Sequence, residues 1–320
     1  MKITVINDDY FVKLTETQLM SIEEVVPGVE LIEVQHDTIT LEDLIDSEVV
    51  FGRVPTLMLK DLKRLKWLHL ASAGADGLMD ASLYANDSIT LTKSSGTFGI
   101  PIAEHVLCMM LALSRNLGHY YQMQRDGIWC DIWPEFQDIS GSTVFVLGLG
   151  DIGTEVCRLL SCFGCNIVGF RNDASKPHKL ISDVRPISLL RESLPEADYV
   201  VICAPGTEKT DKLFGREEFA RMKKRAIIVN IGRGRIIDAD ALVEALNEQQ
   251  ILGAGLDVTE PEPLPPNHPL WSAKNVLITP HVSAATQITI ERRVNVFIDL
   301  LKRYTSGLEM YNIVDFDAGY

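Results

Sequence analysis

The feature that most constrains this sequence is a series of short apolar runs in which hydrophobic residues do not alternate with polar ones. Such runs are typical of parallel strands that helices cover on both faces. Helical stretches separate the runs, as in repeated βαβ units. The runs form two series, residues 3–7, 29–34, 49–52, 67–71 and 89–93, then residues 144–148, 166–170, 199–204, 226–231, 253–258 and 276–280. We therefore predict an α/β fold with two doubly wound parallel-sheet domains.

The segment between the two series, residues 101–117, is expected to be a helix that joins the domains. Pro101 at its start, Glu104 in its first turn and Arg115 near its end are helix boundary signals. Another helical stretch, residues 289–307, follows the last strand and can return the chain to the first domain. The predicted domains are residues 1–100 with 286–320, and residues 101–285.

Length and charge exclude several classes of protein. The 320 residues are enough for two domains with their own cores. The 30 Lys and Arg against 44 Asp and Glu give a net charge of −14, which argues against binding nucleic acid or anionic membranes. The longest apolar stretch, residues 105–114, is shorter than the ~20 residues of a membrane-spanning helix. The start MKITVIND lacks the apolar region of a signal peptide, so we expect a cytoplasmic protein.

The six cysteines are scattered, which favours reduced, structural thiols. Cys157, Cys162 and Cys165 cluster in sequence and would be the candidates for a metal site. One lies within a predicted helix and another in its terminal turn, where small apolar residues pack. No metal site is therefore expected.

A glycine motif points to a dinucleotide. Gly148, Gly150 and Gly153 have GxGxxG spacing, directly after an apolar run and before a helical pattern. In that context the first glycine allows a tight turn, the second lets a pyrophosphate approach the backbone, and the third lets helix and strand pack closely. The amides of Asp151 and Ile152 would then face the phosphates from a helix N-terminus. The alternative is a glycine-rich turn without a ligand.

The residue after the next strand run bears on which dinucleotide is bound. Arg171 stands where NAD enzymes usually carry an acid that meets the adenosine ribose. An arginine can pair with a 2′-phosphate, and Lys176 could add a second positive charge. We predict that NADP(H) is preferred and that NAD(H) is possible. The alternative is a solvated Arg171, with Asp173 serving the ribose.

Three further blocks carry a specific resemblance: MKKRAIIVNIGRGRIID at 222–238, GAGLDVTEPEPL at 253–264 and NVLITPHVSAAT at 275–286. With the glycine motif, the loop LASAGAD at 70–76 and Ala103–His105, they resemble the D-isomer-specific 2-hydroxyacid dehydrogenases. This family includes glyoxylate/hydroxypyruvate reductases, D-lactate dehydrogenases and D-3-phosphoglycerate dehydrogenases. The resemblance implies a Rossmann-type cofactor domain inserted into a flavodoxin-like substrate domain. It also implies hydride transfer between a nicotinamide cofactor and a small 2-oxo acid or D-2-hydroxy acid.

The same resemblance places the catalytic residues at Arg233, Glu262 and His281. Reduction of a 2-oxo acid needs a cation for the carboxylate and carbonyl, which the fork of an arginine supplies. It also needs a proton donor, which a histidine held by a carboxylate supplies. Arg235 and Glu260 are competing candidates, but only Arg233 lies in the RG turn after an Asn, and family spacing favours Glu262.

Further binding residues are expected at strand ends. The resemblance makes Asp257 the acceptor for the nicotinamide carboxamide, with a turn-capping role as the alternative. Thr210 and Ile231 are also expected to contact the cofactor. The backbone around Ala73 and Gly74 offers amides to a substrate carboxylate, unless it is a plain turn.

Two other functions remain open. Formate dehydrogenase shares the fold. The resemblance implies, however, that formate dehydrogenases carry Gln at the position of Glu262. A non-catalytic, dinucleotide-sensing interaction protein of the same fold would turn over no 2-oxo acid at a useful rate. The bridging helix has more apolar surface than one domain hinge needs, so we also expect a homodimer. The sequence leaves the preferred 2-oxo acid undetermined.

Overall fold

The computed structural model describes residues 1–8, 12–75, 77–86, 88–129 and 136–316. The chain divides into two compact units, Met1–Phe98 with Ala285–Tyr320, and Gly99–Ala284. The boundaries fall after Phe98 and Ala284 rather than after residues 100 and 285, because helix α3 (Gly99–Ser114) begins before Pro101. The proline still lies in the first turn, where a missing N–H costs no helical hydrogen bond.

The first unit contains a parallel five-stranded sheet with the order β2-β1-β3-β4-β5, the flavodoxin-like arrangement. The strands are β1 (Lys2–Asn7), β2 (Glu30–Gln35), β3 (Val49–Phe51), β4 (Trp67–Leu70) and β5 (Thr90–Lys93). The helices are α1 (Glu16–Val25), α2 (Leu41–Leu44) and α9 (Gln287–Ser306). All five predicted runs are strands.

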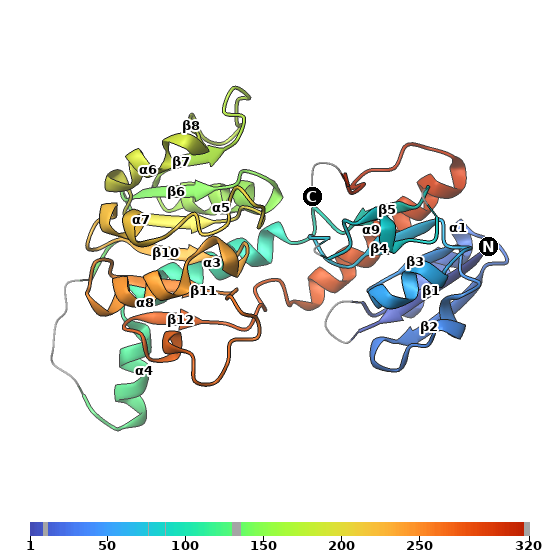
Figure 1. Ribbon diagram of the computed structural model, residues 1–320, viewed down its shortest axis with the longest axis horizontal. Coiled ribbons are helices and arrows are strands. Elements are labelled where there is room, and N and C mark those ends of the chain that lie inside the picture. Colours follow the sequence, from blue (N-terminus) through green and yellow to red (C-terminus); the bar gives the residue numbers. More distant parts are fainter. Residues whose placement is uncertain (9–11, 76, 87, 130–135, 317–320) are drawn as a thin grey trace. The chain divides into compact units, whose positions relative to one another are not determined.

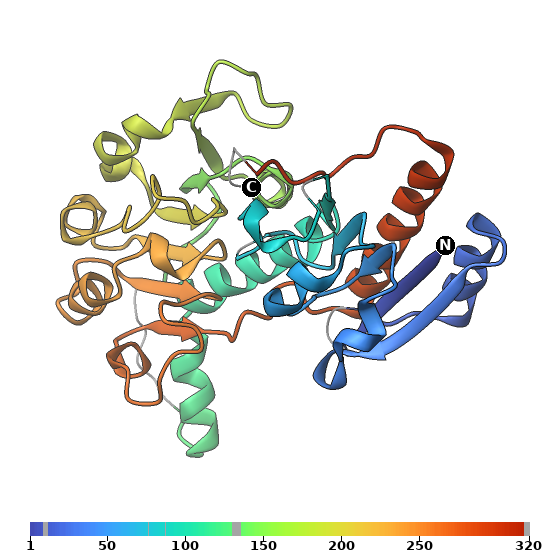
Figure 2. The same cartoon turned by 45° about the vertical axis from the view of Figure 1, so that its right-hand side comes forward.

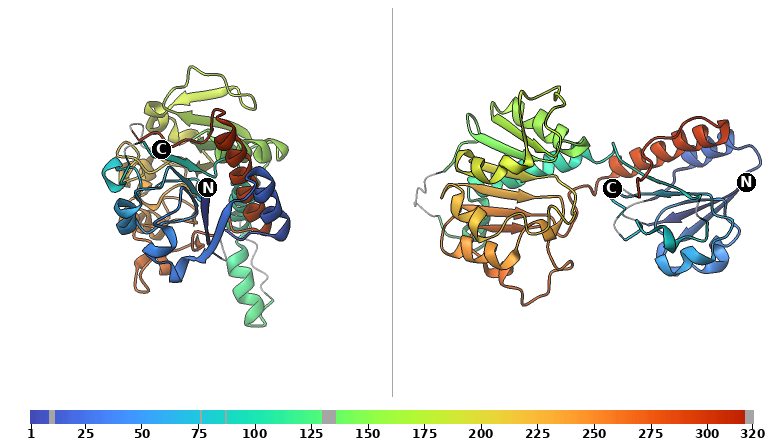
Figure 3. Two further views of the ribbon diagram at one scale, coloured as in Figure 1. Left: turned by 90° about the vertical axis from the view of Figure 1, so that its right-hand side faces the viewer. Right: turned by 45° about the horizontal axis from the view of Figure 1, so that its top comes forward.

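Helix α9 returns the chain to this first unit, as predicted. It packs beside α1 on one face of the sheet, as Figure 3 shows. Its buried Val294 and Phe297 share a core cluster with Ile3 and Trp67 of the strands. A separate cluster that includes Leu44 of α2 covers the other face. Both faces of the sheet are thus buried, which explains the apolar runs.

The second unit contains a parallel seven-stranded sheet with the order β12-β11-β10-β9-β6-β7-β8 (Figure 1). Its strands are β6 (Thr143–Leu147), β7 (Asn166–Arg171), β8 (Asp183–Pro186), β9 (Tyr199–Ile202), β10 (Ile227–Asn230), β11 (Gly253–Leu256) and β12 (Val276–Ile278). The remaining helices are α4 (Leu117–Arg125), α5 (Asp151–Cys162), α6 (Leu190–Ser193), α7 (Arg216–Arg221) and α8 (Ala239–Asn247). Strand β8 was not predicted, because it is a charged edge strand.

The order of these strands positions a ligand site. Strand β6 pairs with β7 on one side and with β9 on the other, so the chain reverses its direction across the sheet at β6. Ligands of doubly wound sheets bind at the carboxyl ends of the strands at such a point. Helix α3 runs along one face of this sheet and packs against β10, β11 and β12 (Figure 2).

Candidate functional site

The glycine motif forms a tight turn from β6 into α5. Gly148 has a φ of +89°, and a Cβ there would lie 2.9 Å from the backbone nitrogen of Ala204. A Cβ on Gly153 would overlap the carbonyl oxygen of Gly148. A Cβ on Gly150 would meet no atom within 4 Å. The first and third glycines are therefore required by packing, whereas the second borders open space at the start of α5, where Asp151 and Ile152 lie.

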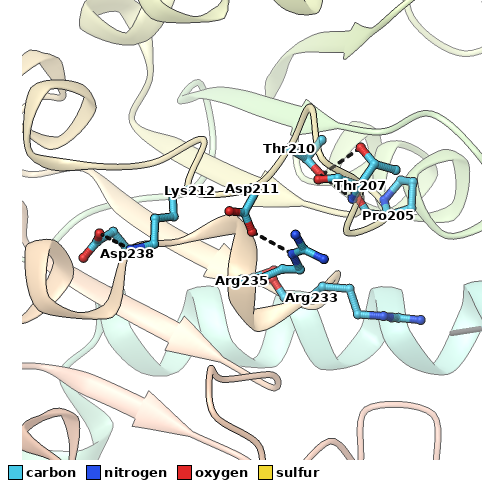
Figure 4. Close-up of polar contacts among 9 residues, drawn as sticks. Pro205, Thr207, Thr210, Asp211, Lys212, Arg233, Arg235 and Asp238 are labelled. Carbon is cyan, nitrogen blue, oxygen red and sulfur yellow. Dashed lines mark hydrogen bonds and ion pairs between the residues drawn. The ribbon is translucent and has the colours of Figure 1, made fainter. Parts of the chain in front are cut away.

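Neighbouring loops complete the edge of the sheet beside this turn. Ile231 follows β10, is buried, and donates its amide to the carbonyl of Ile202 at 3.1 Å. Thr210 lies in the loop after β9, where its hydroxyl donates to the carbonyl of Pro205 at 2.8 Å and accepts from the amide of Thr207 at 2.8 Å (Figure 4). The Thr210 hydroxyl thus shapes its own turn.

Arg171 is the last residue of β7, and its guanidinium is half-enclosed. Its Nε and Nη2 atoms are buried and have no hydrogen-bond partner in the described part of the chain. Two buried donors without an acceptor are costly unless an anion is present.

The loop after Arg171 uses its own charged groups internally. Asp173 accepts from the amide of Ser175 at 3.1 Å, and hydrogen bonds from Ser175 keep the pKa of Asp173 below its usual value. The ammonium of Lys176 lies 3.8 Å from Asp173, and both side chains are mostly exposed. This pair is weak, so Lys176 adds little fixed charge beside Arg171.

Arg233 is held by a turn after β10. The side chain of the buried Asn230 donates to the Arg233 carbonyl at 2.9 Å and accepts from the amide of Gly232 at 3.0 Å. A Cβ on Gly234 would overlap the carbonyl of Thr259. The sequence NIGRG is thus needed to close this turn.

The two arginines of that turn point in different directions. Arg235 donates from Nε to Asp211 at 2.7 Å, a contact that raises its pKa. Figure 4 shows the Arg233 guanidinium directed away from this pair. A cavity of about 480 Å³ is lined by Asp211, Arg235 and Glu260 among others. Both competing candidates, Arg235 and Glu260, therefore border a cavity that Arg233 and Glu262 do not line.

The structure brings His281 and Glu262 together. The Nδ1 atom of His281 lies 2.6 Å from Oε1 of Glu262, and both side chains are about half exposed, at 50% and 43%. A carboxylate can only accept a hydrogen bond, so Nδ1 of His281 carries a proton. Nε2 is therefore the nitrogen that can exchange a proton with a ligand. His281 has a φ of +54°, and its amide donates to the carbonyls of Asp257 and Thr279 at 2.8 and 3.0 Å.

Asp257 holds the turn that carries His281. Its side chain is fully buried and accepts from the hydroxyl of Thr279 at 2.6 Å and from the amides of Val282 and Ser283, each at 3.0 Å. Burial raises its pKa, but hydrogen bonds from Ser283, Thr279 and Val282 outweigh burial and bring it below the usual value. These hydrogen bonds correspond to the capping role considered as the alternative, and they use three of the about four acceptor positions of a carboxylate.

The expected substrate loop belongs to the first unit. Ala73 and Gly74 follow β4, and the hydroxyl of Ser72 donates to the Gly74 carbonyl at 2.5 Å. The amide of Ser94 donates to the carbonyl of Ser72 at 3.0 Å, which joins this loop to the end of β5. Asp76, the last residue of the loop motif, lies outside the described residues.

Comparison with known proteins identifies the family. Residues 107–283 match the family model described as D-isomer specific 2-hydroxyacid dehydrogenase, NAD binding domain. The chain belongs to the D-isomer specific 2-hydroxyacid dehydrogenase family. It is a nicotinamide-dependent oxidoreductase of 2-oxo acids and 2-hydroxy acids, which confirms the predicted family, fold and reaction class.

Relatives in this family include enzymes with different substrates. The D-3-phosphoglycerate dehydrogenase of Methanocaldococcus jannaschii is 33% identical over 86% of this chain but only 53% of its own length, so this chain spans about half of that relative. The glyoxylate reductase of Korarchaeum cryptofilum is 32% identical over 86% of this chain and 81% of its own. A crystal structure of a D-isomer specific 2-hydroxyacid dehydrogenase family protein from Aeromonas salmonicida has a TM-score of 0.87 at 27% identity and covers 99% of both chains.

The remaining structural findings concern membranes and metals. No helix among the described residues combines the length and apolar character needed to cross a bilayer. The described part of the chain also contains no group of three or more His, Cys, Asp or Glu residues arranged to hold a metal ion. Cys157 is buried, and the thiols of Cys162 and Cys165 contact the backbone carbonyls of Arg158 and Ile139.

Two further residues of this dehydrogenase, Thr279 and His105, belong to the network around Asp257. Thr279, directly before Pro280 and His281, donates to Asp257, and His105 on α3 lies 3.0 Å from the Thr279 hydroxyl. Thr279 is the first residue of the TPH motif, and His105 is the last residue of the AEH motif. Sequence spacing gave no sign that they meet.

Proposed function

We propose that this enzyme reduces a small 2-oxo acid to the D-2-hydroxy acid, with His281 as the proton donor, Glu262 as its partner and Arg233 as the cation for the substrate. The 2.6 Å contact between His281 and Glu262 carries the proposal. It is the arrangement that a positioned acid and base requires.

The chemistry assigned to these side chains follows from their atoms. The bound nicotinamide supplies the hydride for the carbonyl carbon. As negative charge develops on the carbonyl oxygen, His281 donates its Nε2 proton to that oxygen, while Glu262 accepts from Nδ1 and offsets the positive charge of the ring. The half-exposed ring then regains a proton from solvent. In the opposite direction His281 removes the hydroxyl proton.

Arg233 is assigned to the substrate carboxylate and carbonyl, since its planar guanidinium offers paired donors. The backbone amides of Ala73 and Gly74 in the first unit are assigned, as the sequence indicated, to a substrate carboxylate. Asp257 contributes by fixing the turn that bears His281.

The residues around the glycine turn fit a dinucleotide. The open space beside Gly150 and the amides of Asp151 and Ile152 suit a pyrophosphate. The buried Nε and Nη2 of Arg171, which have no acceptor among the residues that the structure describes, suit a further anionic group. We therefore propose that NADP(H) is preferred over NAD(H), with Arg171 binding the 2′-phosphate.

We also propose a homodimer, but on a different surface from the one the sequence indicated. The apolar residues of α3 are largely buried, including Val106, Met109 and Met110. Exposed apolar side chains lie nearby, on α4 and after it, among them Tyr121, which is 62% exposed, and Trp129, which is 92% exposed. This surface is a candidate for contact with a second copy.

A substrate panel tests the proposed function. Glyoxylate, hydroxypyruvate, pyruvate and a branched 2-oxo acid are each assayed with NADPH and with NADH, and formate is assayed with both oxidised cofactors. We expect reduction of at least one 2-oxo acid and no oxidation of formate. Turnover of formate alone, or of no substrate, would reject the proposal.

A further inference from the structure

His105 on helix α3 joins the network that holds His281. Its Nε2 atom lies 3.0 Å from the hydroxyl of Thr279 and 3.8 Å from Oδ1 of Asp257. The Thr279 hydroxyl lies 2.6 Å from the same Asp257 oxygen. The His105 side chain is 22% exposed and the Asp257 side chain is fully buried. The three side chains thus form a chain of contacts from α3 to the end of β11.

The direction of each hydrogen bond follows from the atoms. A threonine hydroxyl has one proton, and the Thr279 proton is donated to the Asp257 carboxylate, which can only accept. The Thr279 oxygen must therefore accept from His105, so His105 carries its proton on Nε2. This donated proton prevents the hydroxyl from rotating away from Asp257.

The far end of the chain of contacts reaches the turn of His281. The Asp257 carboxylate accepts the amides of Val282 and Ser283, which follow His281, and the Asp257 carbonyl accepts the amide of His281 itself. His281 has a φ of +54°, a conformation that a non-glycine residue keeps only when its surroundings hold it there. A disturbed Asp257 would therefore release the His281 ring.

We propose that His105 is a positioning residue for the reaction: acting through Thr279 and Asp257, it fixes the turn that aims His281 at the substrate. This inference rests on the proposed function, in which His281 is the proton donor. His105 touches neither substrate nor the reacting atoms. Its donor hydrogen bond, rather than its bulk, is the property that matters.

Two substitutions separate the hydrogen bond from the bulk. His105→Leu keeps most of the volume and removes the donor, whereas His105→Gln places an amide N–H near the position of Nε2. We expect His105→Leu to lower kcat about five- to tenfold, because the substitution removes one hydrogen bond. The affinity for NADPH, measured by fluorescence titration, should stay within about twofold of wild type. His105→Gln should restore most of kcat. A kcat of His105→Leu equal to wild type, or no rescue by His105→Gln, would overturn the proposal.

A double-mutant cycle tests the route through Thr279. If His105 acts through that hydroxyl, His105→Leu should add little to the loss already caused by Thr279→Val, whereas independent effects would multiply. Thr279→Ser retains the hydroxyl and should remain close to wild type. If His105→Leu does not fold, the comparison of Thr279→Ser with Thr279→Val decides: equal kcat values overturn the proposal.

His281→Ala in the same assays distinguishes a failure of the proposed proton donor from a failure of the proposed role of His105. Full activity of His281→Ala would reject the proposed proton donor, whatever His105 does. An inactive His281→Ala with a fully active His105→Leu would reject only the positioning role.

Discussion

The Nδ1 atom of His69 lies 2.7 Å from the hydroxyl of Thr92, inside the core of the first unit. The Thr92 oxygen accepts from the indole of Trp67 at 2.8 Å, so its proton is free to go to His69. On the other side, the hydroxyl of Ser94 donates to the Leu70 carbonyl and so accepts from His69 Nε2 at 3.1 Å. The network is complete only when the imidazole is neutral, and burial lowers its pKa to about 3.

This relationship predicts a loss of stability in acid. In the unfolded chain a histidine takes up a proton near pH 6.5, while the buried His69 does so only near pH 3. Between these values the unfolded state binds one proton more, so the free energy of unfolding falls by up to about 1.4 kcal/mol for each pH unit lost. Urea unfolding of the wild type between pH 7.5 and 5 measures this slope.

The matched variant is His69→Gln, which retains polar partners but does not titrate. We expect it to be less stable than wild type at pH 7 and to lose less stability as the pH falls. His36→Gln, at a histidine outside the core whose side chain is 35% exposed, is the control for the substitution itself. Equal slopes for wild type and His69→Gln would contradict the prediction.

For His281, we predict that replacement by Ala lowers turnover by ~10²- to 10⁴-fold, the usual effect of losing a positioned general acid. Binding of the reduced cofactor should change little, because the proposed contact is with the substrate oxygen. Glu262→Gln should also lower kcat, because a neutral amide offsets less of the ring's positive charge than a carboxylate does. Steady-state kinetics and fluorescence titration of NADPH provide both quantities.

Glu260→Gln is the control for Glu262, since Glu260 lies two residues away and borders the separate cavity. It should retain activity close to wild type. A larger loss in Glu260→Gln than in Glu262→Gln would transfer the acidic role to Glu260.

The two arginines of the RGR turn should behave differently. Arg233→Ala is expected to raise KM for the 2-oxo acid and to lower kcat, because a cation on the carboxylate and carbonyl acts in both the ground state and the transition state. Arg235→Ala removes an exposed ion pair with Asp211 and should alter kcat/KM less than about threefold. Kinetics against the best 2-oxo acid would show the contrast, and similar losses in both variants would remove the basis for assigning Arg233.

Much of this architecture could be predicted because a strand that is buried on both faces of a sheet has a continuous run of apolar residues. The fully buried strands β9 and β10 were found from their apolar runs alone. Strand β8 has no such run: it lies at the sheet edge, and its Arg185 is paired with Asp183 and Glu196 in a surface cluster. Strands of this kind look like loops in sequence.

The site was predictable in parts for a related reason. Gly148 and Gly153 are required by the local geometry of one turn, and a short sequence motif is enough to predict such a turn. Asp257 accepts hydrogen bonds from its own turn because His281 has a left-handed conformation. The residue type at position 281 does not predict that conformation. The contact of His105 with Thr279 joins residues 174 positions apart, so it appears only when α3 packs on the sheet.

We expect a dimer in solution. Sedimentation at micromolar concentration should give a species of about twice the 35.6 kDa chain mass. Replacement of Tyr121 and Trp129 by Asp should weaken association, because charges in an apolar interface are costly to desolvate. Leu57→Asp is the control, since Leu57 is 92% exposed on the first unit. A 35.6 kDa species for the wild type would refute the dimer.

The last prediction concerns cofactor preference. The buried Nε and Nη2 of Arg171 have no acceptor within the described residues, and we assign the guanidinium of this residue to the 2′-phosphate. A charge-assisted contact of this kind contributes about 1.5 to 3 kcal/mol, so kcat/KM should favour NADPH over NADH by roughly ten- to a hundredfold.

Arg171→Asp should reverse that order, because a carboxylate accepts from a free ribose hydroxyl and repels a phosphate. Lys176→Ala is the matched control: its ammonium is exposed and paired with Asp173, so the loss of NADPH preference should be small. Comparison of kcat/KM for both reduced cofactors in the three proteins tests the assignment. A wild type that already favours NADH, or a preference that Arg171→Asp leaves unchanged, would show that Arg171 does not select the cofactor.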